Sequence, residues 1–72
     1  MVKYKLEFIL NTFNTDKEEV KNSLLPFGEN LEISEGGAEL KINMLTDDPT
    51  MIFDICSQFG RIKSAKIDEE EK

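Results

Sequence analysis

Histidine is absent from this sequence, and cysteine occurs once, at position 56. Without histidine the chain lacks the usual general base, the commonest metal ligand and the side chain that normally titrates near neutral pH. A single cysteine cannot form an internal disulfide, which is typical of a reducing compartment. No apolar run approaches the roughly 20 residues of a membrane span, and the alternating start MVKYKLEF differs from a signal peptide. We therefore expect a cytoplasmic protein that makes no membrane contact.

The charge balance is acidic. Fifteen acidic residues against nine basic ones give a net charge of −6 over 72 residues. This charge disfavours binding to nucleic acids unless the basic residues gather on one face. The length allows one small domain. We place that domain at residues 1–67 and expect residues 68–72, which are acidic and contain no core-forming side chain, to be a frayed tail.

Two kinds of apolar spacing alternate along the chain. VKYKLEFIL (2–10) has the period of two of a strand with one buried face, whereas NTDKEEVKNSLLPFG (14–28) has helical spacing and ends at Pro26. NLEISEGGAELKINML (30–45) has the alternation and Gly-Gly turn of a hairpin. TDDPTMIFDICSQFG (46–60) begins with a helix cap followed by proline, and RIKSAKID (61–68) is typical of a strand.

The predicted order is therefore strand, helix, strand, strand, helix, strand. This order indicates an α+β, ferredoxin-like βαββαβ sandwich, with a four-stranded antiparallel sheet and two helices on one face. An internal echo supports two similar halves, because TDKEEVKNSLLPFGENLEI and TDDPTMIFDICSQFGRIKSAKI both run from Thr-Asp through a helix and Phe-Gly into a strand.

Residues 40–67, LKINMLTDDPTMIFDICSQFGRIKSAKI, resemble the first strand, first helix and second strand of an RNA recognition motif. The resemblance implies a shared architecture. In that family the first strand carries an aromatic side chain that stacks on bases. Lys41 stands at the matching position, and too few residues follow Ile67 for the later basic and aromatic strand.

We expect no catalytic residue, no cofactor and no metal. Cys56 lies late in an apolar helical stripe, where neither a base nor the helix dipole would favour its thiolate, so we assign it to the core. The predicted first loop, NTFNTD (11–16), lacks the two cysteines of ferredoxin-like metallochaperones. It also lacks the arginine of acylphosphatase-like enzymes and the glycine usual in ACT-type regulatory domains.

Our leading hypothesis is a non-enzymatic interaction or regulatory module that binds a protein partner or a second copy through its open sheet face. Ile9 on the polar face and Phe13 in the first loop are the candidate contacts, although Phe13 is equally suited to cover the end of the core. The alternative is a nucleic-acid-binding face built from six basic residues, namely Lys3, Lys5, Lys41, Arg61, Lys63 and Lys66. That alternative requires these bases to form a continuous face, with Glu7, Glu32 and Glu39 lying off it.

Overall fold

A computed structural model describes residues 2–12 and 16–71, with the side chains of Val2 and Glu71 left undescribed. The predicted order of strands and helices is confirmed, with one 3₁₀ turn added after the first helix. The elements are β1 (Val2–Thr12), α1 (Lys17–Leu24), the 3₁₀ turn η1 (Leu25–Phe27), β2 (Glu29–Gly36), β3 (Glu39–Thr46), α2 (Pro49–Ser57) and β4 (Gly60–Glu71).

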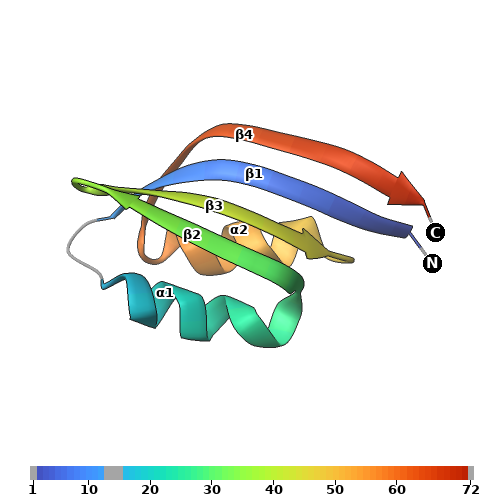
Figure 1. Ribbon diagram of the computed structural model, residues 1–72, viewed down its shortest axis with the longest axis horizontal. Helices are drawn as coiled ribbons and strands as arrows, with labels where there is room; N and C mark the ends of the chain where they lie inside the picture. The colour runs from blue at the N-terminus through green and yellow to red at the C-terminus, as the bar shows by residue number, and fades with distance from the viewer. Residues whose placement is uncertain (1, 13–15, 72) are drawn as a thin grey trace.

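The four strands form one antiparallel sheet in the order β2-β3-β1-β4. Figure 1 shows α1 and α2 on the same side of this sheet, so its other face is uncovered. The start of β1 and the end of β4 lie side by side, since Val2 is paired with Glu71. The predicted ferredoxin-like arrangement of two layers is therefore confirmed.

The core lies between the sheet and the helices. Alternation along the central strand β1 buries Leu6, Phe8 and Leu10, because successive side chains of a strand point to opposite faces. The Phe8 ring meets the Phe53 ring of α2 edge to face, with centroids 5.3 Å apart. The remaining fully buried apolar side chains come from α1, β3 and α2, and they are Val20, Leu24, Leu40, Ile42, Met44, Ile52 and Cys56.

The two helices begin differently. Asp48 caps α2, because its carboxylate accepts a hydrogen bond of 3.2 Å from the Met51 backbone N–H, and Pro49 is the first helical residue. Asp16 occupies the same position before α1, but its side chain makes no capping hydrogen bond. The other cap that we considered for α1, Thr15, lies outside the described residues.

The acidic end of the chain corrects one prediction. Residues 68–71, which we expected to be part of a frayed tail, continue β4 and pair with Val2–Lys5 of β1. The reason is that β1 begins at Val2 and offers its backbone along its whole length. Ladder hydrogen bonds form between main-chain groups, so an acidic segment with solvent on both sides can still extend a strand. Residue 72 lies outside the described residues.

Both edge strands contain an irregularity. In β4 the pairing with β1 shifts between Glu7 and Ile9, and Ser64 has a φ of 55° at that point. In β2 the pairing with β3 shifts between Glu29 and Glu32, and Asn30 has a φ of 53°. A β-bulge of this kind adds one residue to a strand, and it reverses which face the following side chains occupy.

Candidate interaction surface

The uncovered face of the sheet carries the polar side chains of all four strands. Residues directly opposite each other in an antiparallel pair point to the same face, so the register identifies its members. We name this set the open face, and it comprises Lys3, Lys5, Glu7, Ile9, Asn11, Glu32, Ser34, Glu39, Lys41, Asn43, Leu45, Arg61, Lys63, Lys66, Asp68 and Glu70.

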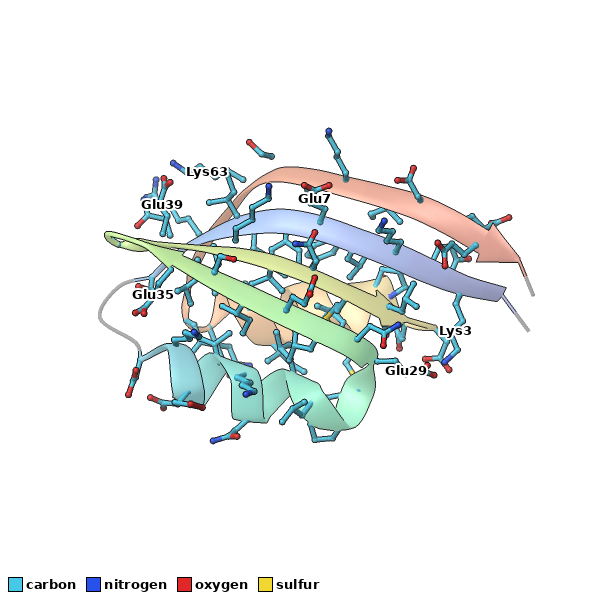
Figure 2. The ribbon with its side chains drawn as sticks, in the orientation of Figure 1. Lys3, Glu7, Glu29, Glu35, Glu39 and Lys63 are labelled. Atoms are coloured by element: carbon cyan, nitrogen blue, oxygen red, sulfur yellow. The ribbon has the colours of Figure 1, made fainter. Side chains whose placement is uncertain are left out.

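Ion pairs link the strands along this face. The Lys41 Nζ lies 3.4 Å from Glu7 Oε2, and the Lys63 Nζ lies 2.5 Å from Glu39 Oε2. At the far end of the sheet Lys3 pairs with Glu29 of β2, and Figure 2 shows these side chains converging. The hydrogen bond that the Lys3 ammonium donates to Glu29 raises its pKa, and the charge of Asp47 acts in the same direction. The basic residues nearest to carboxylates are thus partly neutralised within the domain.

The six basic residues that we singled out do lie on the open face, but acids lie among them. Glu7 and Glu39 hold Lys41 and Lys63, and Glu32 lies across from Asn43 on the same face. Asp68 and Glu70 add two further carboxylates opposite Lys5 and Lys3. The condition that we set for a nucleic-acid-binding face, with Glu7, Glu32 and Glu39 off it, is therefore not met. A phosphate backbone approaching this surface would meet carboxylates as well as ammonium groups.

Two apolar side chains interrupt the charges. Ile9 is half-buried between Lys41 of β3 and Lys63 of β4, and Leu45 is half-buried opposite Lys5. Shallow hollows adjoin both positions: one of about 250 Å³ contacts Ile9, and one of about 320 Å³ contacts Leu45. Our sequence reasoning missed Leu45, although its strand parity with Glu39, Lys41 and Asn43 indicated this face. Phe13, our other candidate contact, lies outside the described residues.

A third hollow, of about 360 Å³, lies at the end of the sheet between η1 and the start of α2. Its floor includes Thr46, a buried residue whose hydroxyl donates a 2.8 Å hydrogen bond to the Phe27 carbonyl and accepts one of 3.1 Å from the Asp48 N–H. Phe27 and Met51 flank it and are 42% and 39% exposed. We had placed Phe27 on the apolar stripe of the first helix, but the 3₁₀ turn carries it to the rim.

The described residues hold no evident catalytic group. The Cys56 side chain is fully buried, and burial raises the pKa of its thiol to about 12, so the thiolate is scarce at neutral pH. Within residues 2–12 and 16–71, the chain has no cluster of three acidic or cysteine side chains placed to hold a metal ion. Neither helix in this part of the chain is long and apolar enough to cross a membrane.

Comparison with known proteins identifies a family. None of the curated proteins compared with the chain matches it significantly. The family of FakA-like middle domains, which is named for one of the subunits of fatty acid kinase, has a sequence profile that matches residues 1–71, nearly the whole chain. The chain therefore belongs to the family of FakA-like middle domains of fatty acid kinase.

Proposed function

We propose that this domain is a non-catalytic interaction module within a fatty acid kinase assembly and that it contacts a protein partner through its open face. The family to which it belongs is named for one subunit of such a kinase. A kinase positions a nucleotide and metal ions and neutralises phosphate charge. The described residues offer neither a metal-ligand cluster nor a reactive cysteine, so we assign the chemistry to other parts of the assembly.

The observation that carries the proposal is the arrangement of charges around Ile9. Lys41 and Lys63, which flank it on neighbouring strands, are each bound to a carboxylate of the same face. The centre of the face therefore combines an apolar side chain with charges that are already paired. Interfaces between proteins have this character, with few unpaired charges at the centre and a polar rim. We include a cytoplasmic location in the proposal, on the basis of the single cysteine.

The experiment measures binding of the 72-residue chain to each of the other purified polypeptides of the fatty acid kinase from the same organism, by isothermal titration calorimetry. Ile9→Lys and Leu45→Lys place a new charge at the two apolar positions of the open face. Glu18→Lys is the matched control, because Glu18 is exposed on α1, in the opposite layer. We expect each open-face variant to weaken binding about 10-fold or more, since hot-spot side chains at an interface centre account for more than about 1.4 kcal/mol. Equal binding by all four proteins would refute the proposal, as would the absence of binding by the wild type.

Two further measurements separate this proposal from its competitors. The chain alone should transfer no phosphate from ATP to a fatty acid, and measurable transfer would contradict a non-catalytic role. Titration with short single-stranded RNA at low salt should leave the amide resonances of the open face unshifted, because carboxylates lie among its bases. Salt-sensitive shifts confined to Lys5, Lys41 and Lys63 would support the nucleic-acid alternative instead.

A further inference from the structure

The outer edge of β4 is a long unpaired strand edge. β4 spans Gly60–Glu71 and is the last strand of the sheet on its side, beyond β1. Figure 1 shows no element of the described chain covering that edge. Exposed edges are templates for pairing with another strand, and natural proteins either block them or use them.

The two halves of β4 carry opposite charge. Arg61, Lys63 and Lys66 lie in the first part, and residues 68–71 are all acidic. Arg61, Asp68 and Glu70 make no ion pair with any other described residue. An antiparallel neighbour reverses the order of residues, so a second copy of the same strand would bring its acidic half against the basic half of the first.

The bulge at Ser64 makes this match geometrically consistent on one face of the sheet. In a regular strand, the residues on one face are all odd-numbered or all even-numbered, and a two-fold pair cannot place an odd residue opposite an even one. The bulge adds one residue, so Arg61 and Lys63 before it share the open face with Asp68 and Glu70 after it. A two-fold register can then place Arg61 opposite Glu70 of the second copy and Lys63 opposite Asp68 of the second copy.

We propose that two copies of this domain associate through antiparallel pairing of their β4 edges in this register, which joins two four-stranded sheets into one continuous sheet. Two short ladders, each between residues 60–63 of one copy and residues 68–71 of the other, flank the paired bulges. Lys63 can serve both Glu39 in its own chain and Asp68 of the second copy, since an ammonium group has three hydrogen-bond donors. The proposal does not rest on the open face binding a partner.

The other edge of the sheet lacks this self-complementarity. β2 carries Glu29, Glu32 and Glu35 and no basic residue, so two β2 edges would bring like charges together. An acidic β2 edge against the basic part of β4 would be a head-to-tail contact, which leaves unused edges and forms open-ended assemblies rather than a closed dimer. This alternative makes a distinct prediction for charge variants of β4.

The test is sedimentation equilibrium of the 72-residue chain with two charge-reversal variants, Arg61→Glu/Lys63→Glu and Asp68→Lys/Glu70→Lys. The wild type should form a dimer that weakens as salt is added. Each variant alone should dimerise about 10- to 100-fold more weakly, because like charges then face each other at four positions. An equimolar mixture of the two should recover association close to that of the wild type, since each variant's edge complements the other. Circular dichroism spectra confirm that each variant remains folded.

Several results would overturn the proposal. A wild-type chain that stays monomeric at about millimolar concentration, where even weak complexes form, excludes it. A dimer that survives both reversals uses another surface, and a mixture that fails to recover association removes the charge-matched register. If Arg61→Glu/Lys63→Glu abolishes association but Asp68→Lys/Glu70→Lys does not, the β2 contact is favoured. Leu45→Lys should leave the dimer intact, so this outcome is independent of the calorimetric test of the open face.

Discussion

Replacing Gly60 with alanine should destabilise this domain more than any other single-methyl addition at a glycine. Gly60 is buried at the start of β4, where it pairs with Thr12 of β1. A Cβ atom at this position would lie 2.1 Å from the Asn11 carbonyl oxygen and 2.8 Å from both the Asn11 carbonyl carbon and the Thr12 Cα. All three atoms belong to the backbone of the central strand, so no side-chain rotation relieves the overlap.

The magnitude follows from what must move. Overpacking commonly costs about 1–3 kcal/mol, and displacement of a paired backbone belongs at or above the upper end of that range. A domain of this size has a total free energy of unfolding of about 4–11 kcal/mol. We therefore expect Gly60→Ala to lose about 3 kcal/mol or more, which lowers the melting temperature by at least about 12 °C.

The assay is thermal and urea unfolding followed by circular dichroism, with Gly36→Ala as the matched control. Gly36 also lies in a strand, but a Cβ there meets no atom within 4 Å and its φ is not in the left-handed region. Gly36→Ala should therefore change the free energy of unfolding by less than about 0.5 kcal/mol. Equal melting temperatures for the two variants would refute the reasoning, because only the packing of Gly60 against β1 distinguishes them.

Two further predictions concern the helix caps and the cysteine. Asp48→Ala should lower the free energy of unfolding by about 1 kcal/mol because it removes the hydrogen bond to the Met51 N–H, whereas Asp16→Ala, which removes none, should cost clearly less; equal losses in urea unfolding would contradict the assignment of the cap. Burial raises the pKa of the Cys56 thiol from its ordinary value of 9.0 to about 12, so the unfolded chain loses this proton at lower pH than the folded one. The stability advantage of the wild type over Cys56→Ala should therefore be complete below about pH 9 and decline as pH rises toward 12, and an advantage that grows with pH would oppose this sign.

The elements that could be predicted from the sequence are those whose signals are local. Alternation in residues 2–10 identifies β1 and its buried face, because strand parity depends on the strand alone. The sequence Asp48-Pro49 locates the start of α2, since capping and the fixed φ of proline act within one turn. The order of elements then favours one of few sheet topologies.

The features that escaped prediction depend on a neighbouring strand. Residues 68–71 have no strand-like alternation, and they join the sheet because β1 extends to Val2 beside them. The bulge at Ser64 carries no glycine that would have indicated a positive φ. The pairing of Lys41 with Glu7 and of Lys63 with Glu39 depends on register between strands, which periodicity within each strand leaves undetermined.

The same bulge connects the two proposals to the physics of edge strands. A bulge twists an edge and normally hinders pairing with arbitrary strands, which protects against aggregation. In β4 it also selects among partners, because a neighbour must supply a matching extra residue and the opposite order of charge. A second copy satisfies both requirements, whereas a regular strand satisfies neither. Specificity of this kind comes from disfavouring wrong partners as much as from attraction to the right one. It would leave the open face, with its paired charges around Ile9, available for a different polypeptide of the kinase.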